Sequence, residues 1–367
     1  MTEEELQHLI ALTLVPQIGD VHTRLLLQHF GAPSAVFRAR RRELERIPGI
    51  GSTRAGAIRA FRNMARAERE LRFIGKHGVT ALAHGTPEYP RRLAHCYDAP
   101  VILYYRGNAD LNAQRIISIV GTRAPTDYGR EWTAALLQGL APFAPVVVSG
   151  LAYGIDTVAH RNALRNGLQT VGVVAHGLDR IYPPANRDLA KEMLSAGGLL
   201  SDFLSGIPPD AQNFPRRNRI VAGMADAVVV VETGEKGGSI ITADIANSYD
   251  RDVFALPGRA TDPASKGCNR LIHDHRAQLV TTPAQIVALL NWDERPSLPA
   301  KAQASLFPEL SPSERDLLGL IRDHPGRAVD ELGAKARLKP SETAAALLNL
   351  EMLGLVTCLP GKRYRPA

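Results

Sequence analysis

Residues 116–120 read IISIV, a short run of apolar side chains that ends at Gly121. Runs of this kind are too apolar to alternate between core and solvent, so each predicts a strand buried on both faces. Helical stretches separate the runs, and this alternation predicts an α/β fold with a doubly wound sheet. The six other runs are VILYY from Val101, PVVVS from Pro145, TVGVVA from Thr170, GLLSDF from Gly198, AVVVVE from Ala227 and DVFAL from Asp252.

A helical module is predicted ahead of the sheet, over residues 1–75. Its apolar residues follow helical spacing, and two glycine breaks interrupt them. The segments VPQIGDVHTRLLLQHFG from Val15 and IPGIGSTRAGAIRAF from Ile47 are typical of paired helix-hairpin-helix units. Gly49 and Gly51 would let backbone N–H groups approach a phosphate closely. A helical module that packs and binds nothing is the alternative.

Two further regions follow the sheet domain, which is predicted over residues 85–292. Residues 293–312 are rich in proline, serine and alanine without sustained periodicity, and they predict a linker. Residues 313–367 predict helices at 314–323 and 329–336, a third helix with Ser341 as its N-cap, and a basic hairpin, LVTCLPGKRYRP. This order predicts a winged helix domain, and a module that binds only proteins is the alternative.

The charge of the chain is unevenly distributed. Lys and Arg number 44 against 37 Asp and Glu, for a net charge of +7. Residues 1–80 hold 13 basic and 8 acidic side chains, and residues 311–367 hold 9 and 7, so the middle of the chain is neutral. Neutralising phosphates needs Arg or Lys at the contact itself. A nucleic-acid site in the middle must therefore be a local pocket.

The expected location is the cytoplasm, with no membrane partner. Cys96, Cys268 and Cys358 lie far apart without CxxC spacing, so neither a disulfide framework nor a zinc site is expected. The N-terminus, MTEEELQHLI, is acidic. No apolar run approaches the length of about 20 residues that spans a bilayer. We also expect no cofactor and no metal.

Polar turns follow several of the predicted strands, at the edge where doubly wound sheets bind ligands. SIVGTRAPTDYGRE, from Ser118, places a glycine and an arginine at a helix N-terminus, which builds an anion site. QNFPRRNRIVAG, from Gln212, combines guanidinium groups with an aromatic ring, the mixture that binds single strands. Together with the turns in VVVSGLAYGIDTVAH, from Val146, and GLDRIYP, from Gly177, they supply the candidate ligand-binding residues, which are Gly121, Thr122, Arg123, Ser149, Gly150, Gly154, Tyr182, Phe214, Arg216, Arg217, Asn218 and Arg219.

The order and spacing of six segments resemble the DNA processing protein A (DprA, also called Smf) family. They are SIVGTR, VSGLAYGIDTVAH, GLDRIYP, FPRRNRIVAG, GGSIITADIA and DVFALPGR, and the resemblance is strongest over residues 85–290. It implies an extended Rossmann-like domain whose pocket binds single-stranded DNA, a helix-hairpin-helix or SAM-like N-terminal domain and a winged C-terminal domain. It also implies protection of incoming DNA and transfer of the strand to the RecA recombinase in natural transformation.

The resemblance adds two sets of residues. Gly238, Ser239 and Thr242 match a loop that would complete the floor of the pocket. The stretch 271–280 matches the segment of a homodimer, with Leu271, Ile272 and Leu279 as candidate interface residues. That stretch departs from the family pattern by one extra residue and a missing glycine, and Pro184 stands where many members have a lysine.

The sequence favours DNA binding without catalysis over three classes of enzyme. Ser149, Asp156 and His160 do not form a hydrolase triad pattern, because no G-x-S-x-G elbow is present. A nucleotide-binding phosphoribohydrolase is the main alternative, since TGEKGGSIIT resembles its glycine-rich loop; against it, the first acid after Ser239 is Asp244. An NAD-dependent oxidoreductase lacks its G-x-G-x-x-G run.

Overall fold

The structure is a computed structural model that describes residues 1–292 and 310–366. It divides into two compact units, Met1–Asp293 and Glu294–Ala367, and each is described by itself. Residues 293–309, which make up most of the predicted linker, lie outside the described residues. In the part that is described, no helix is both long and apolar enough to cross a membrane.

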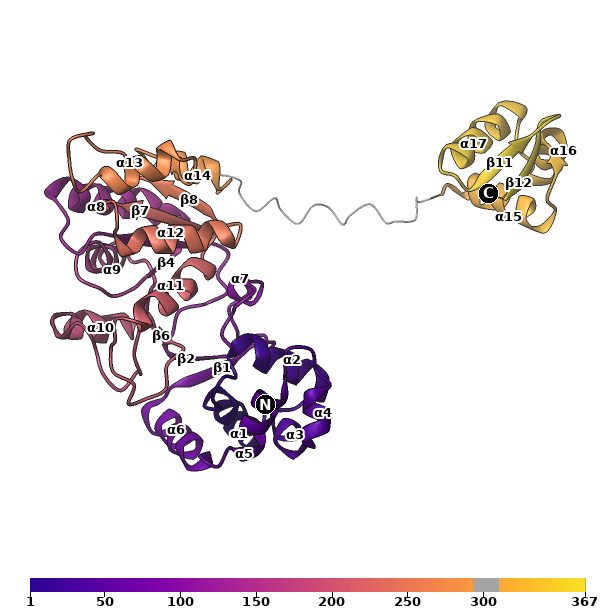
Figure 1. Ribbon diagram of the computed structural model, residues 1–367. Coiled ribbons are helices and arrows are strands. Elements are labelled where there is room, and N and C mark those ends of the chain that lie inside the picture. Colours follow the sequence, from indigo (N-terminus) through magenta and orange to yellow (C-terminus); the bar gives the residue numbers. More distant parts are fainter. Residues whose placement is uncertain (293–309, 367) are drawn as a thin grey trace. The chain divides into compact units, whose positions relative to one another are not determined.

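A nine-stranded sheet with the order β1-β2-β6-β5-β4-β3-β7-β8-β9 forms the centre of residues 1–292 (Figure 1). The strands from β6 to β9 are all parallel, and β2 and β1 join them in antiparallel pairs at one edge. The fold class and all seven predicted strands are confirmed. The strands are β1 (Thr80–Ala83), β2 (Ile102–Gly107), β3 (Ile116–Gly121), β4 (Val146–Ser149), β5 (Thr170–Val173), β6 (Gly197–Ser201), β7 (Ala227–Val231), β8 (Asp252–Ala255) and β9 (Gln278–Leu279).

Helices cover both faces of this sheet. Ile116 and Val120 belong to one buried cluster, and Ile117 and Ile119 belong to another on the opposite face, because successive side chains of a strand alternate. The first cluster includes residues of α11 (Asn213–Gly223), α12 (Gly238–Ser248) and α13 (Lys266–His273). The second includes residues of α8 (Asp127–Leu140), α9 (Ile155–Arg165) and α14 (Pro283–Leu289). Helix α10 (Arg187–Met193) packs beside β5 and β6.

The strand order reverses at β3, which lies between β4 and β7. The chain proceeds from β3 through β4 and β5 to β6 in one direction, and then crosses back to β7 on the other side of β3. In open α/β sheets such a switch point leaves a crevice outside the carboxyl ends of the strands. The fold therefore places the turns after β3, β4 and β7 around one crevice.

The helical module precedes the sheet and packs as two hairpin units, as predicted. Helices α1 and α2 form the first unit around the turn at Gly19, and α4 and α5 form the second around Gly49. Gly49 has a φ of 83°, a left-handed conformation that glycine adopts without strain. The helices are α1 (Glu3–Thr13), α2 (Asp20–Phe30), α3 (Pro33–Arg38), α4 (Arg41–Glu45), α5 (Ser52–Ala60), α6 (Met64–His77) and the short α7 (Arg91–Ala94).

Arg219 of α11 joins the helical module to the sheet. Its guanidinium lies 2.8 Å from the Asp20 carboxylate at the start of α2 and 2.9 Å from that of Asp202. Asp98 is a third, more distant partner at 4.0 Å. Arg219 is only 11% exposed, so these charges interact in a largely water-free setting. The first hairpin unit is therefore anchored on the helix that follows β6.

The C-terminal unit, described over residues 310–366, has its helices and strands in the order of a winged helix domain. A three-stranded sheet with the order β10-β12-β11 packs against three helices around a core that includes Leu317, Leu347 and Val356. The third helix begins at Pro340 with Lys339 as its N-cap, so the prediction of Ser341 at that position was wrong. Proline favours the first helical position because it lacks an N–H and has a helical φ. The elements are α15 (Pro312–Asp323), β10 (Arg327–Ala328), α16 (Val329–Ala336), α17 (Pro340–Met352), β11 (Val356–Leu359) and β12 (Arg363–Pro366).

We expect Arg219→Ala to lower the free energy of unfolding of residues 1–292 by about 3–5 kcal/mol, because it leaves buried carboxylates without their cation. Urea unfolding and hydrogen exchange at α2 measure the effect. Arg216→Ala is the matched control on the same helix, since Arg216 is 53% exposed and lies 3.3 Å from Asp202. Equal stability of the two variants would contradict the anchoring role of Arg219.

Candidate functional site

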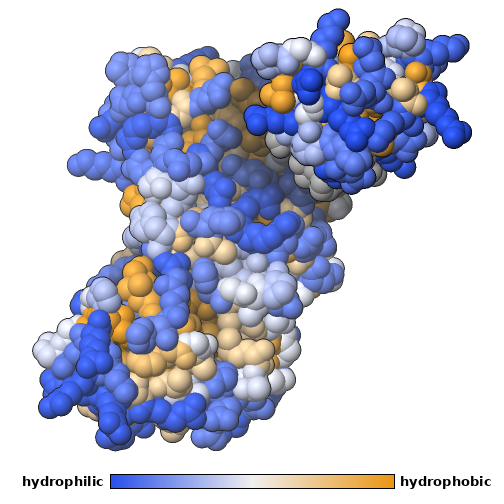
Figure 2. All heavy atoms as spheres, turned by 90° about the vertical axis from the view of Figure 1, so that its right-hand side faces the viewer, coloured by the Kyte–Doolittle hydropathy of each residue, from blue (hydrophilic) through white to orange (hydrophobic). Residues whose placement is uncertain are grey.

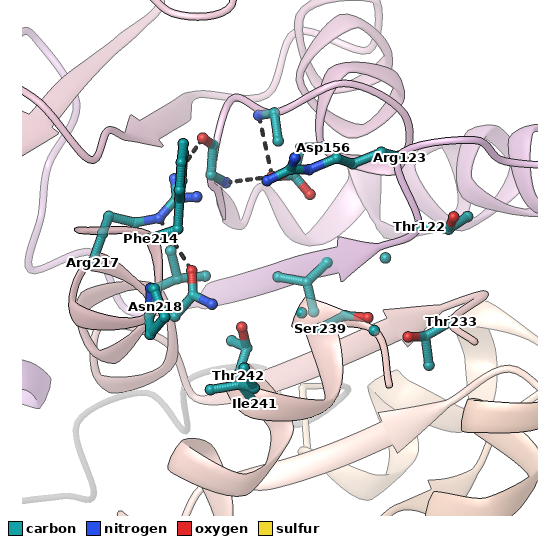
Figure 3. A pocket seen from close by; sticks show the side chains of 18 of the residues that line it. Thr122, Arg123, Asp156, Phe214, Arg217, Asn218, Thr233, Ser239, Ile241 and Thr242 are labelled. Atoms are coloured by element: carbon teal, nitrogen blue, oxygen red, sulfur yellow. Dashed lines mark hydrogen bonds between the residues drawn. The ribbon is translucent and has the colours of Figure 1, made fainter. Parts of the chain in front are cut away.

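A cavity of about 310 Å³ opens at the switch point of the sheet (Figure 3). Residues from the turns after β3, β4 and β7 line it, together with the first turns of α11 and α12. The sequence predicts that polar turns after the strands meet at one edge of the sheet, and the turns after β3, β4 and β7 do so here. The lining residues are Val120, Gly121, Thr122, Arg123, Gly150, Ala152, Asp156, Phe214, Pro215, Arg217, Asn218, Val221, Thr233, Gly234, Gly237, Gly238, Ser239, Ile241 and Thr242.

The turn after β3 is held by close backbone packing. A Cβ on Gly121 would lie 2.1 Å from the carbonyl oxygen of Val231, so only glycine fits. The Thr122 N–H donates to the Glu232 carbonyl at 2.8 Å, and the Thr126 N–H donates to the Glu232 carboxylate at 2.9 Å. Glu232 thus ties the end of β7 to the N-terminus of α8. Arg123, at the tip of the turn, is exposed and free to meet a ligand.

The turn after β4 packs directly on the first turn. Gly154 has a φ of 82°, and a Cβ there would lie 2.2 Å from the Thr122 carbonyl oxygen. The carboxylate of Asp156 accepts hydrogen bonds from the N–H groups of Gly150, at 3.1 Å, and Ala152, at 3.3 Å. Asp156 therefore fixes the shape of the glycine turn from the helix that follows it.

Arg217 is buried in the wall of the cavity. Its guanidinium donates to the carbonyl oxygens of Gly150 and Val173, and its Nε donates to the Asn218 side chain at 3.2 Å. Burial lowers the pKa of Arg217 to about 10, and Asp156 acts against that shift. The group stays charged at neutral pH. Burial likewise raises the pKa of Asp156, while Arg217 acts to lower it.

The first turn of α12 forms the opposite wall of the cavity. Ser239 is 7% exposed and Thr242 is 2% exposed, and both face the lining residues of α11 (Figure 3). The Ser239 hydroxyl is buried without a hydrogen-bond partner among the described residues. A buried hydroxyl without a partner is unfavourable, so a ligand oxygen at this position would satisfy it.

An aromatic surface extends the site beyond the cavity. The Arg123 guanidinium carbon lies 5.4 Å from the centroid of the Phe214 ring, within the range of a cation–π contact. The Tyr182 and Phe214 rings are 6.2 Å apart. A second, smaller cavity is lined by Tyr182, Phe214 and Arg123, so the two cavities share a wall. One guanidinium and two aromatic rings thus lie next to one another on this surface.

Several predicted site residues lie elsewhere. Ser149 is buried beneath the turn, where its hydroxyl donates to the Ile119 carbonyl at 2.6 Å. Arg216 points away, 5.1 Å from the Phe203 ring. Arg219 anchors the helical module, as described above. The candidate interface residues Leu271, Ile272 and Leu279 belong to α13 and β9 at the far edge of the sheet, and Leu271 is a core residue at 1% exposed.

The residues that the sequence did not single out as ligands have small or apolar side chains, apart from Asp156. Thr233 and Ile241 line the cavity, and Ile241 is 43% exposed. Nothing in the type of these two residues signals binding. Asp156 did have a signal, because an acid in the first turn of a helix after a glycine turn can hold that turn.

His160 of α9 and Ser149 of β4 each hydrogen-bond to a group outside the Ser149, Asp156 and His160 set. The His160 ring pairs with the Thr170 hydroxyl at 2.7 Å, and burial lowers its pKa to about 3, so it is neutral at pH 7. The Ser149 proton goes to a backbone carbonyl. Across residues 1–292 and 310–366, no group of three or more His, Cys, Asp or Glu is placed to hold a metal ion.

We expect Gly154→Ala to lower the free energy of unfolding of residues 1–292 by about 2–5 kcal/mol, because the added Cβ would meet backbone atoms at a position with a positive φ. Gly238→Ala is the matched control, because Gly238 lines the cavity but a Cβ there would meet open space. Its effect should stay within about 1 kcal/mol. Urea unfolding compares the two, and a similar loss in both would contradict the packing of the two turns.

Comparison with known proteins confirms the resemblance. Residues 80–291 match the model of the DNA recombination-mediator protein A family, and residues 299–362 match that of the DprA winged helix domain. The chain is 34% identical to Protein Smf of Synechocystis sp., over all of both chains. It resembles the X-ray structure of DNA processing protein A from Streptococcus pneumoniae, with a TM-score of 0.63 and 32% identity over 78% of this chain and 98% of that one. It also resembles the structure of DNA processing protein A from Helicobacter pylori, with a TM-score of 0.53 and 30% identity over 59% of this chain and 96% of that one. The chain belongs to the DNA recombination-mediator protein A family.

Proposed function

We propose that this protein binds single-stranded DNA in the cavity at the switch point and passes the strand to a RecA recombinase. The observation that carries the proposal is the unpartnered Ser239 hydroxyl facing a cavity that also holds the Arg123 and Arg217 guanidinium groups. The Helicobacter pylori relative is described as having a single-stranded DNA binding mode, which supports the same ligand here.

The geometry supports a division of labour between charge and stacking. Arg123 is the exposed cation, so it would pair with a phosphate, and Ser239 at the start of α12 would donate to the same or the next phosphate. Phe214 and Tyr182 would stack on unpaired bases, which a duplex cannot offer. Arg217 would act from beneath as a fixed positive charge. Gly121, Thr122, Gly150, Asn218, Gly238 and Thr242 would shape the path of the backbone.

Arg123→Ala should weaken binding of a labelled single strand at least about tenfold and lower its salt dependence by about one phosphate contact. Arg165→Ala, at the C-terminal end of α9, is the control and should leave the affinity unchanged. Fluorescence anisotropy over a salt series measures both. Arg217→Ala should also lose at least about tenfold, provided that its circular dichroism is native. Unchanged affinity in both the Arg123 and the Arg217 variant would overturn the pocket.

The role in recombination is also part of the proposal. A protein that holds a strand by its backbone protects it and leaves it available for transfer, as RecA loading in natural transformation requires. We propose a homodimer through the edge of the sheet at β9, where Leu279 is 45% exposed. Leu271 and Ile272 would support that edge from α13. The proposed location is the cytoplasm, where such a partner acts.

We propose that the chain has no catalytic activity of its own. The carboxylate in the cavity, Asp156, is already hydrogen-bonded to the Gly150 and Ala152 N–H groups and faces Arg217. Asp244, the first acid after Ser239, pairs instead with Arg276. Incubation with nucleoside monophosphates should therefore release no free base by chromatography. Sustained turnover would favour the phosphoribohydrolase alternative.

A further inference from the structure

One short segment of the helical module, residues 38–62, has a net charge almost as large as that of the whole chain, and we call it the arginine segment. It contains eight arginines and two glutamates, a net charge of +6, whereas the whole chain has +7. Its elements are the end of α3, all of α4, the second hairpin and α5. The proposed DNA cavity uses none of these residues. Their concentration on one small module therefore calls for a separate explanation.

The two hairpin units of the module differ in what they contact. The first is occupied within the chain: Asp20 pairs with Arg219, and the Arg24 guanidinium donates to carbonyl oxygens of residues 96, 97 and 99. In the second, Pro48, Gly49, Gly51, Ser52 and Thr53 are all exposed. Helix α5 starts there with Gly51 as N-cap and no side-chain cap. The arginine segment thus contains a hairpin whose turn residues are exposed and whose Gly49 carbonyl accepts a hydrogen bond from Arg54 at 2.9 Å.

Contacts to the backbone hold several of these arginines close to one another. The Arg59 guanidinium donates to the Phe37 and Ala39 carbonyls, beside Arg38 and Arg40. Arg62 donates to the Arg59 carbonyl. At the other end of α5, Arg41 reaches the Ser52 carbonyl at 3.5 Å. Figure 2 shows strongly hydrophilic atoms along the lower edge of the helical module.

Few acids compensate this charge. Arg41 pairs with Glu45 at 2.8 Å, and Glu43 accepts from the Arg40 N–H. Arg42 and Arg46 are exposed, lie one helical turn apart, and make no ion pair with any residue that the structure describes. Like charges held this close repel one another, so an anionic partner would be stabilising.

The partner should be recognised by its backbone and not by its bases. The aromatic residues of the module nearest this surface, Phe37 and Phe61, are half-buried and pack against the module's core. Their rings are held against that core, whereas Tyr182 beside the cavity is 41% exposed, so we expect base stacking at the cavity and not on this surface. We propose that the arginine segment is a second DNA site, which binds the phosphodiester backbone of duplex DNA. This inference rests on the proposed function in one respect, which is that the ligand is DNA.

The two sites are held on one body. Helix α11 carries Phe214 and Arg217 at the cavity and Arg219 at the anchor of the helical module. A DNA molecule with a duplex and a single-stranded tail could therefore engage both sites at once. Binding at one site would raise the effective concentration of DNA at the other.

The test compares full-length variants on three labelled DNAs: a single strand, a blunt duplex and the same duplex with a tail. Arg42→Glu/Arg46→Glu should weaken binding of the blunt duplex at least about tenfold and reduce the slope of log affinity against log salt by about two. It should also remove any advantage of the tailed DNA over the single strand. Binding of the single strand should change by less than about threefold.

Arg161→Glu/Arg165→Glu is the matched control. It makes the same change in charge at the same helical spacing, on two exposed arginines of α9 that lie outside the arginine segment. Its duplex affinity should match that of the unmodified chain to within about threefold. Equal losses in the two double variants would show a general charge effect and overturn the second site.

Arg123→Ala separates this inference from the proposed function. It should lose the single strand and keep the blunt duplex, the reverse of the arginine-segment variant. An unmodified chain that binds the single strand but no duplex, even at low salt, would overturn the second site and leave the cavity assignment intact. If Arg123→Ala and Arg217→Ala both kept the single strand and the duplex, the cavity assignment would be overturned and the second site would stand.

Discussion

The close approach of Gly121 and Gly154 to neighbouring backbone is the constraint on which the site depends. Gly121 lies against the end of β7, and Gly154 lies against the turn that Gly121 begins. The ends of β4, β3 and β7, which are neighbours in the sheet, are thereby packed closely together. Arg123 stands at the tip of this stack, and Arg217 fills the space behind it. A larger residue at either glycine would separate the walls that these arginines share.

The position and burial of single arginines matter more in this protein than its net charge. The sheet region is neutral overall, yet its cavity keeps one exposed guanidinium and one buried guanidinium close together. Asp156 makes that arrangement tolerable because it faces Arg217 and also holds the turn around it. Net charge therefore says little about where a polyanion binds, whereas the local balance of paired and unpaired arginines says much.

The sequence was sufficient to predict seven strands and the convergence of their turns. An uninterrupted apolar run that ends at a polar or glycine turn is typical of a strand buried on both faces. Strands β1 and β9 were missed, since four and two residues carry too little pattern. The stretch FPRRNR misled in another way. Consecutive residues on a helix project about 100° apart. Arg217 therefore lines the cavity, whereas Arg216 and Arg219 both pair with Asp202, and only the placement of α11 in the fold reveals this difference.

The anchoring of the helical module also bears on how the chain can be divided. Leu9, Ile10 and Ala67 of that module share a buried cluster with Val101, Ile102 and Tyr104 of the sheet. Cutting the chain between residues 75 and 85 would expose this apolar surface and leave Asp202 and Arg219 without Asp20. The module is a covering layer for the edge of the sheet. An exchange of that module between relatives would have to carry the matching sheet residues with it.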